Sequence, residues 1–247
     1  MSDEALHAAR ERLLRARSLL VLTGAGISVA SGLRTYRGAE ESLYADPARL
    51  RLAFGSSLRR DPGAFWREWR PRRRELRAAR PNPGHAALVV LEARLPRFLL
   101  ATQNVDDLHR RAGSRAPVEL HGNALLERCL AECPGPAWPA PEAGDADDAP
   151  APTCPRCGGP GRPDVVLFGE GADARWEPVR AFARAGVDLV LLVGTSGTVA
   201  VPEELLRLVR AAGPVWVVEL NLTPAVAGVD AALPGRAEEL LPALLLP

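Results

Sequence analysis

The stretch that most constrains the fold of this chain is residues 18–38, SLLVLTGAGISVASGLRTYRG. An apolar run of strand length at residues 19–22 leads through Gly24 and Gly26 into a segment that can begin a helix. Glycine has no Cβ, so the backbone can turn tightly here and approach a ligand, while the following helix offers free N–H groups and a positive dipole end. The stretch predicts a strand, a glycine turn and a helix that can hold a pyrophosphate. A plain tight turn would explain the same residues, because the third glycine of the dinucleotide-binding fingerprint is missing.

The composition narrows the classes of protein to which the chain can belong. With 247 residues, 47% hydrophobic and 25% charged, it fits one large or two modest globular domains. A net charge of +1 gives no general basic field, so we expect no nucleic-acid partner. We expect no membrane association and a cytoplasmic location, because no apolar stretch reaches roughly 18 to 20 residues and the N-terminus is unlike a signal peptide. The oligomeric state is left open, and a monomer is compatible with the sequence.

Apolar runs of strand length recur at residues 97–102, 187–193 and 215–220. They are nearly continuous rather than alternating, and helical patterns such as residues 203–212 separate them. Strands of this kind are typical of a parallel sheet that is covered by helices on both faces. The sequence therefore predicts an α/β fold of the Rossmann type, with a doubly wound parallel sheet.

Residues 39–80 differ from this pattern because they are rich in arginine and aromatic side chains. Phe54, Phe65, Trp66 and Trp69 are spaced so that helical structure can bring them near one face. The segment is predicted to be a helical insert in the main fold.

Polar residues follow the predicted strands at the points where the strands end. Asn104 and Asp106 come after the second strand, and Ser196 and Asn221 come after the next two. Because the carboxyl ends of parallel strands meet at one edge of a sheet, we expect these side chains beside the first glycine turn, within reach of a nucleotide's phosphate and ribose. For Asp106, capping of the following helix is an equally simple interpretation.

His121 lies next to Gly122 at the end of a short extended run, VELHGN. A single histidine is more often structural than catalytic. One in a glycine-flanked loop near a predicted nucleotide site is nevertheless a candidate general base, because its ordinary pKa lies near neutral pH.

The four cysteines lie in a segment, residues 127–162, that is rich in proline, alanine and acidic residues and is not expected to form a core of its own. Cys129 and Cys133 form C-x₃-C, and Cys154 and Cys157 form C-x₂-C. Four thiolates in two pairs satisfy tetrahedral zinc with no open position, so a structural zinc ion is predicted. Because the first pair is one residue longer than the usual C-x₂-C, a weakened site or free thiols remain alternatives.

The chain resembles the sirtuins of bacterial type, a family of NAD-dependent protein lysine deacylases, because seven of its motifs occur in the order in which sirtuins carry them. They are GAGISVASG with YRG, TQNVDDLH, ELHGN, the paired cysteines, RPDVVLFGE, GTSGTVAVP and ELN, and they cover nearly the whole length. The resemblance implies a Rossmann-type NAD-binding domain (residues 1–125 and 162–247, with the insert at about 39–80) and a small zinc-binding module at 126–161. An acyl-lysine peptide would meet the nicotinamide riboside in the cleft between them.

The resemblance also implies an activity and its residues. The chain would remove acyl groups from protein lysines with NAD, giving nicotinamide and O-acyl-ADP-ribose, with His121 as the base and Asn104 as its catalytic neighbour. The NAD-binding residues implied are Gly24, Ala25, Gly26, Ser28, Arg37, Gln103, Asn104, Asp106, Gly194, Thr195, Ser196, Asn221 and Ala237. The acyl-lysine protein or peptide would lie along Val165, Phe168, Gly169 and Glu170. Protein mono-ADP-ribosyl transfer and a non-catalytic NAD sensor are alternative functions.

The chain departs from the family pattern where the loop and the acyl group would meet. Arg34 and Tyr36 stand where sirtuins commonly have proline and phenylalanine, and Leu167 replaces a tryptophan. Sirtuins that remove succinyl or malonyl groups carry Tyr-x-x-Arg, and here Trp69 and Arg72 occupy those places. Arginine suits a fixed carboxylate because its guanidinium is bidentate and always charged. The alternative is that residues 72–74 form a solvated helix face.

Overall fold

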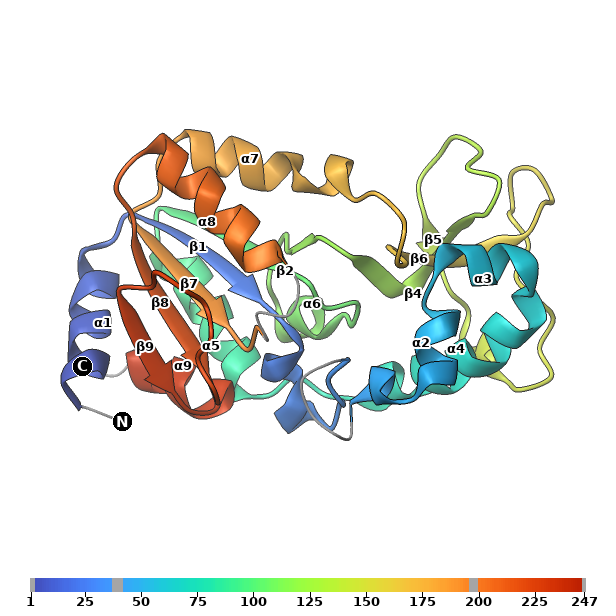
Figure 1. Ribbon diagram of the computed structural model, residues 1–247, viewed down its shortest axis with the longest axis horizontal. Coiled ribbons are helices and arrows are strands. Elements are labelled where there is room, and N and C mark those ends of the chain that lie inside the picture. The colour runs from blue at the N-terminus through green and yellow to red at the C-terminus, as the bar shows by residue number, and fades with distance from the viewer. Residues whose placement is uncertain (1–2, 37–41, 196–199, 246–247) are drawn as a thin grey trace.

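The computed structural model describes residues 3–36, 42–195 and 200–245. Within these ranges the main sheet is parallel throughout, with the strand order β3-β2-β1-β7-β8-β9 (Figure 1). Its strands are β1 (Ser18–Thr23), β2 (Arg97–Thr102), β3 (Val118–Glu119), β7 (Leu189–Val193), β8 (Trp216–Asn221) and β9 (Ala231–Pro234). Counted along this sheet alone, the order is that of the Rossmann fold, and it reverses direction between β1 and β7. That reversal is where such sheets bind ligands.

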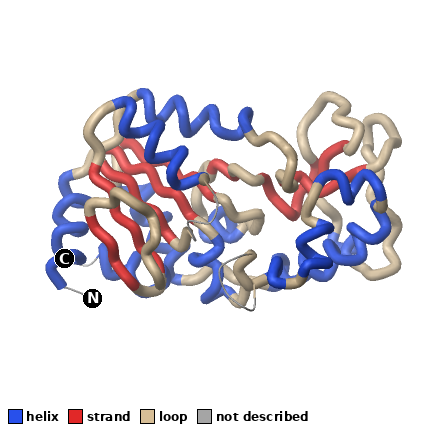
Figure 2. The backbone as a smooth tube through the Cα atoms, viewed as in Figure 1, coloured by secondary structure: helices blue, strands red, loops and turns tan. Residues whose placement is uncertain are grey.

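Helices cover both faces of the sheet, as Figure 2 shows. The side chains of β1 alternate between two separate cores, with Leu19 and Val21 in one and Leu20 and Leu22 in the other. Since every residue of β1 and β7 is buried, these strands have continuous apolar sequences. One core is closed by α1 (Asp3–Arg15), α5 (Pro83–Arg94) and α9 (Ala237–Leu245), and the other by α7 (Glu177–Arg184) and α8 (Val201–Ala212). The predicted doubly wound α/β fold is confirmed.

A smaller part of the molecule lies at the end opposite the termini (Figure 1). It contains an antiparallel sheet in the order β5-β4-β6 and the helices of the insert. These elements are α2 (Pro47–Leu52), α3 (Gly55–Arg60), α4 (Pro62–Ala78), β4 (Gly122–Cys129), β5 (Trp138–Pro139) and β6 (Gly161–Val165). The division into an NAD-binding domain and a module at 126–161 stays a prediction.

A third apolar core joins the insert to the rest of the chain. Phe65 and Trp66 of α4 are buried in it, Trp69 is partly buried against it, and Val165 of β6 packs with them. The predicted aromatic face of the insert is thus correct for α4. It is wrong for Phe54, which precedes α3 and is 41% exposed, with its ring 5.3 Å from that of Phe168.

Short helices complete the described chain. They are α6 (Leu108–Ala112) and the 3₁₀ helices η1 (Ala25–Ser31), η2 (Leu43–Ala45), η3 (Glu142–Asp145) and η4 (Asp173–Trp176). Among the described residues, no helix is both long enough and apolar enough to cross a membrane.

Candidate active site and metal centre

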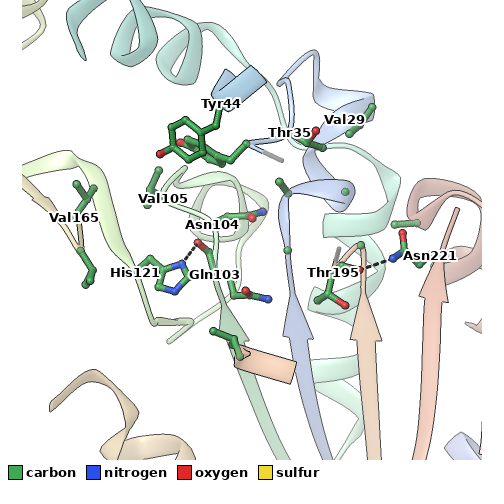
Figure 3. A pocket seen from close by; sticks show the side chains of 18 of the residues that line it. Val29, Thr35, Tyr44, Gln103, Asn104, Val105, His121, Val165, Thr195 and Asn221 are labelled. Carbon is green, nitrogen blue, oxygen red and sulfur yellow. Dashed lines mark hydrogen bonds between the residues drawn. The ribbon is translucent and has the colours of Figure 1, made fainter. Parts of the chain in front are cut away.

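A cavity of about 880 Å³ opens at the carboxyl edge of the main sheet and extends to β6 and the insert (Figure 3). Most of the predicted site residues in the described chain line it. These are Gly24, Ala25, Gly26, Trp69, Gln103, Asn104, His121, Val165, Phe168, Gly169, Glu170, Gly194, Thr195, Asn221 and Ala237. The predicted residues Ser28, Asp106 and Arg72 are not in its lining. Arg37 and Ser196 lie outside the described residues.

Glycine is needed in the turn after β1 for packing against the protein backbone, and not for the free N–H groups that the sequence suggests. Gly24 and Gly26 donate their N–H groups to Val193 and Gly194, both at 2.9 Å, so these two N–H groups are already engaged within the protein. A Cβ on Gly24 or Gly26 would lie 2.7 or 2.6 Å from the backbone of Gly194. The turns after β1 and β7 therefore pack backbone against backbone. Since both turns line the cavity, a ligand there can approach their main chain closely.

Ser28 and Asp106 lie behind the cavity wall and hold Asn104. The Asn104 amide donates to Ser28 Oγ at 3.1 Å, and Ser28 Oγ donates to Asp106 Oδ2 at 3.0 Å. The other Asp106 oxygen accepts from the Leu108 N–H at 3.1 Å, so it does cap the start of α6. Burial raises the pKa of Asp106, although the hydrogen bonds from Leu108 and Ser28 to its carboxylate oppose the rise. Asp106 thus acts on the cavity through Ser28 and Asn104.

His121 lines the cavity, and one of its ring nitrogens is held by the backbone. Its Nδ1 lies 3.0 Å from the carbonyl oxygen of Gln103 (Figure 3). A carbonyl can only accept, so Nδ1 carries the proton and Nε2 of the neutral ring is the basic atom. Burial lowers the pKa of His121 below its ordinary 6.5; the Arg175 charge also lowers it, and the Gln103 bond opposes both. The ring is therefore neutral at pH 7 and able to accept a proton.

Gly122 allows this placement of His121. It has φ +83°, and a Cβ there would lie 2.0 Å from the Asp164 carbonyl oxygen on β6. No other residue type fits between β4 and β6 at this point, because the left-handed backbone and the contact both exclude a side chain.

The part of the cavity beside Asn221 depends on an acidic residue that sequence reasoning missed. Glu219 is completely buried in β8, and its carboxylate accepts from the N–H groups of Ala225 and Val226 at 3.0 Å each. These bonds hold residues 222–226, part of which lines the cavity beside Asn221. A single acidic residue in the otherwise apolar run VWVVEL was the available signal.

In the loop after β6, the side chain of Glu170 is held by hydrogen bonds within the protein. Both of its oxygens accept from the buried Arg162, at 2.5 and 2.9 Å, and Oε2 also accepts from the Leu167 N–H. Phe168 pairs with the insert instead, donating to Ala53 O at 3.0 Å. Glu170 braces the loop that ends in Gly169, and its partner Arg162 was not predicted.

The four cysteines come together as the predicted zinc site requires. Their sulfur atoms all lie within 4.8 Å of one another, with 3.6 Å between Cys129 and Cys157 and 3.4 Å between Cys133 and Cys154. A zinc ion with four sulfur ligands at about 2.3 Å places these atoms about 3.8 Å apart, so the four thiols fit the ion. The extra residue in C-x₃-C does not keep Cys133 out of the cluster.

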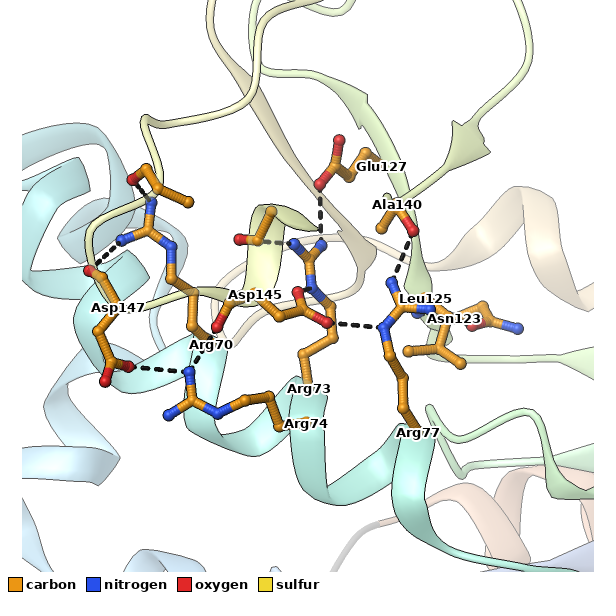
Figure 4. A network of polar contacts seen from close by, with 12 residues as sticks. Arg70, Arg73, Arg74, Arg77, Asn123, Leu125, Glu127, Ala140, Asp145 and Asp147 are labelled. Carbon is orange, nitrogen blue, oxygen red and sulfur yellow. Dashed lines mark hydrogen bonds and ion pairs between the residues drawn. The ribbon is translucent and has the colours of Figure 1, made fainter. Parts of the chain in front are cut away.

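Arginines of α4 attach both β4 and the segment between the two cysteine pairs to the insert (Figure 4). Arg73 is 1% exposed and binds Glu127 at 2.8 Å and Asp145. Arg77 binds the second Asp145 oxygen at 2.6 Å. These contacts supply the packing that the proline- and acid-rich segment cannot supply itself.

A model of the Sir2 family matches residues 24–201 of this chain. The chain belongs to the Sir2 family. This confirms the resemblance to sirtuins. An NAD-dependent protein deacylase of Thermus thermophilus is 47% identical to the Sir2 chain over 227 residues, which cover 90% of this chain and 85% of that relative.

Solved structures of Sir2 proteins share the fold over almost the whole chain. A crystal structure of a Sir2 homologue–NAD complex has a TM-score of 0.82 and 31% identity, covering 99% of this chain and 93% of the other. A Sir2 complex with p53 peptide and NAD+ has a TM-score of 0.78 and 25% identity, covering 95% of each chain. The cavity described above thus belongs to a Sir2 fold.

In this Sir2 chain, Arg34 and Tyr36, which depart from the family pattern, both contact Arg72. The side chain of Arg34 lies 3.6 Å from Glu75, and its carbonyl oxygen accepts from Arg72 at 3.4 Å. Arg72 also donates to Glu75 at 2.9 Å, and its guanidinium lies 5.2 Å from the centre of the Tyr36 ring. Arg34 therefore ties its loop to α4, where the family commonly stiffens the loop with proline.

The expectation of a solvated face at residues 72–74 is wrong for Arg72 and Arg73, which are 9% and 1% exposed. Arg74 is exposed but binds Asp147 at 2.8 Å. Burial acts to lower the pKa of Arg72, but the nearby Tyr36 and the ion pair with Glu75 raise it above the ordinary value. Arg72 is thus a buried, permanently charged group beside the cavity.

Proposed function

We propose that this chain removes acyl groups from lysine side chains of proteins, using NAD. The observation that carries the proposal is the position of His121, whose Nδ1 lies 3.0 Å from the Gln103 carbonyl oxygen in a cavity that Asn104 and the glycine turns also line. The names of the relatives and the NAD and peptide complexes of similar structures support it.

Each end of the cavity has a part in this reaction. Gly24, Ala25, Gly26, Thr195 and Asn221 would hold NAD along the sheet edge, and the cavity is large enough for a ligand of that size. Bound NAD would supply the ribose carbon from which nicotinamide leaves and to which the acyl oxygen becomes attached.

The residues of the chain would bind, orient and move a proton. His121 would accept a proton at Nε2 from a hydroxyl group in the cavity, while its Nδ1–H stays on the Gln103 carbonyl and stabilises the imidazolium. Asn104, oriented by Ser28 and Asp106, would fix that hydroxyl group or a water molecule. The peptide would lie beside Val165 and Gly169 as an added strand.

Incubation with NAD and an acetyl-lysine peptide, followed by mass spectrometry, tests the proposal. Deacylated peptide, nicotinamide and O-acetyl-ADP-ribose in equal amounts are expected. A peptide or protein that gains ADP-ribose and keeps its acetyl group would indicate mono-ADP-ribosyl transfer. Binding of NAD without either product would indicate a sensor.

We further propose that the chain accepts acyl groups that end in a carboxylate, such as succinyl, with Arg72 as the cationic partner. Replacing Arg72 with alanine is expected to abolish desuccinylation and spare deacetylation, because only the longer acyl group reaches the guanidinium. Initial rates on succinyl- and acetyl-lysine forms of one peptide measure this.

Arg74→Ala is the matched control, since it removes an exposed arginine from the same helix. Arg72→Lys keeps the charge but loses the fork of donors, and it should retain only part of the desuccinylation. Equal losses on both substrates in Arg72→Ala would contradict the role of Arg72, as would a wild-type protein that does not desuccinylate.

Glu219→Gln is expected to raise the KM for NAD about tenfold and leave the KM for the peptide unchanged. The amide loses the charge of the carboxylate that holds Ala225 and Val226, and each such charge-assisted bond is worth about 1.5–3 kcal/mol. Steady-state kinetics with each substrate varied in turn provide the measurement. Glu203→Gln, an exposed change on α8, is the control. A matching rise in both KM values would show that Glu219 has no local effect on the NAD side.

A further inference from the structure

Beside the loop after β6, a cluster of charged side chains contains more arginines than carboxylates. Arg175 binds Asp164 Oδ1 at 2.6 Å. Arg162 binds both oxygens of Glu170, at 2.5 and 2.9 Å, so each carboxylate has a guanidinium of its own. Arg128 is a third arginine, and it lies opposite Arg162 where β4 pairs with β6. These side chains together therefore carry one positive charge in excess.

Arg128 has no hydrogen-bond acceptor within the described residues. The carboxylate oxygens nearest to it, on Asp164 and Glu170, are 3.8 and 3.7 Å away, which is too far for a hydrogen bond. Its Nε is buried without a partner, whereas the side chain as a whole is 34% exposed, so a ligand from solution can reach it. Burial and the charge of Arg162 lower the pKa of Arg128 in spite of the two carboxylates. The positive charge of Arg128 is thus incompletely compensated.

The other carboxylates near Arg128 are already engaged. Glu119 is bound through both of its oxygens by Arg110, at 2.8 and 3.2 Å. Glu127 precedes Arg128 in β4, and it binds Arg73 at 2.8 Å. Among the described residues no further carboxylate is available to Arg128, so an anion that neutralises it has to come from another molecule.

Arg128 lies close to the place proposed for the peptide. It is 3.7 Å from Glu170, and Glu170 lines the cavity together with Val165 and Gly169. An extended peptide advances about 3.3 Å per residue, so a residue only a few positions from the acyl-lysine can reach Arg128. A carboxylate suits this guanidinium because it carries the opposite charge and can accept from two donors at once.

We propose that Arg128 binds the carboxylate of an aspartate or glutamate near the acyl-lysine of the substrate protein, and so favours acidic sequences around the modified lysine. The inference rests on the proposed deacylase function and deepens it by naming a class of substrate sequence. Because the acidic side chain takes no part in the reaction, its contact stabilises bound substrate and transition state equally. The contact therefore lowers KM and leaves kcat unchanged.

The experiment uses one acetyl-lysine peptide that has no other charged side chain. Glutamate is placed in turn at each of about four positions on either side of the acetyl-lysine, within the reach of an extended chain, and glutamine at the same position is the neutral control. For the wild type, glutamate at one or more positions is expected to lower the KM about two- to fivefold relative to glutamine, as for a partly exposed ion pair. The kcat should stay within about twofold.

Variants at Arg128 test whether this residue causes the preference. Arg128→Gln is expected to abolish the preference for glutamate while leaving KM and kcat for the glutamine peptides unchanged, which also shows that the variant is folded. Arg128→Lys keeps the charge and should retain part of the preference. Arg59→Gln is the matched control, because Arg59 is an exposed arginine of α3 that lies 3.6 Å from Glu132. This control should keep the full preference.

Salt provides a test that needs no variant. The preference of the wild type for glutamate should shrink as the salt concentration rises from about 0.05 to 1 M, because salt screens a partly exposed ion pair. A preference that stays the same over this range would contradict an ion pair with Arg128.

The possible failures are distinguishable. If the wild type deacylates none of the peptides, the proposed function is wrong and this inference falls with it. If it deacylates them all without a preference for glutamate at any position, the deacylase function stands and the role of Arg128 is refuted. A preference that persists in Arg128→Gln, or that Arg59→Gln loses to the same extent, would also overturn that role.

Discussion

Replacing His121 with alanine is expected to lower kcat/KM for an acetyl-lysine peptide by about 10² to 10⁴-fold, the usual contribution of a positioned general base. The Nε2 atom is the basic nitrogen of a ring that Gln103 orients, and alanine supplies neither the base nor the orientation. Binding of NAD, measured by calorimetry, should change little. His7→Ala is the control, because that exposed histidine lies on α1 and pairs with Glu11. A His121→Ala protein that kept more than about a tenth of the activity would contradict the role of His121.

The pH dependence of kcat/KM tests the role of His121 independently. Because burial lowers the pKa of His121 below 6.5, the active neutral form predominates at and above that pH. The rate should fall as the pH drops through the lowered pKa, so the acid limb of log kcat/KM is expected to have its midpoint below 6.5. A midpoint above 6.5 would show that another group controls the reaction.

Two other histidines make a folding control necessary in that experiment. Burial lowers the pKa of His85 to about 4 and that of His109 to about 3, and the rings lie 4.9 Å apart. Above pH 6.5 both rings are neutral whether the chain is folded or not. As the pH falls from 6.5 towards these values, the unfolded chain binds the protons first, so stability decreases. The folded fraction must therefore be measured at each pH.

Removing the metal site is expected to have the largest effect on stability. Structural zinc contributes about 10–16 kcal/mol of apparent binding free energy in small domains. Residues 127–162 are otherwise held by the antiparallel sheet and by the arginines of α4. Cys154→Ala should lose the zinc, lower the thermal midpoint and expose the segment to proteolysis. Metal analysis, thermal melting and limited proteolysis measure these changes.

Asp148→Ala is the matched control for the zinc experiment, because this exposed residue lies between the two cysteine pairs and is not one of the four clustered thiols. It should keep one zinc ion per chain. A wild-type protein with well below one zinc per chain would contradict the metal site and favour free thiols.

Sequence patterns predicted the buried strands well and the marginal ones poorly. β1, β7 and β8 were recognisable because strands buried on both faces are continuous apolar runs. β9 is short, lies at the sheet edge and ends in Pro234, and β5 contains only two residues. Neither has a pattern that distinguishes it from a loop, because pairing with a neighbouring strand defines it.

Some residues of the site could also be predicted from the sequence, and others could not. Asn104 and Asn221 follow from the rule that ligands bind at the carboxyl ends of parallel strands, and both line the cavity. The burial of Arg73 could not be predicted, because its partners Glu127 and Asp145 lie 54 and 72 residues away. Helical periodicity gives the face on which an arginine lies but does not show which distant segment covers it.

The attachment of the segment between the cysteine pairs to α4 depends mainly on main-chain acceptors. Apart from Asp145 and Asp147, the acceptors there are main-chain carbonyls, including Ala140 for Arg77 and Ala149 for Arg70. Every residue type carries a carbonyl oxygen, so the arginines retain these acceptors whichever side chains the segment acquires. Side-chain substitutions in this segment other than at Asp145 and Asp147 are therefore expected to leave its attachment to α4 in place.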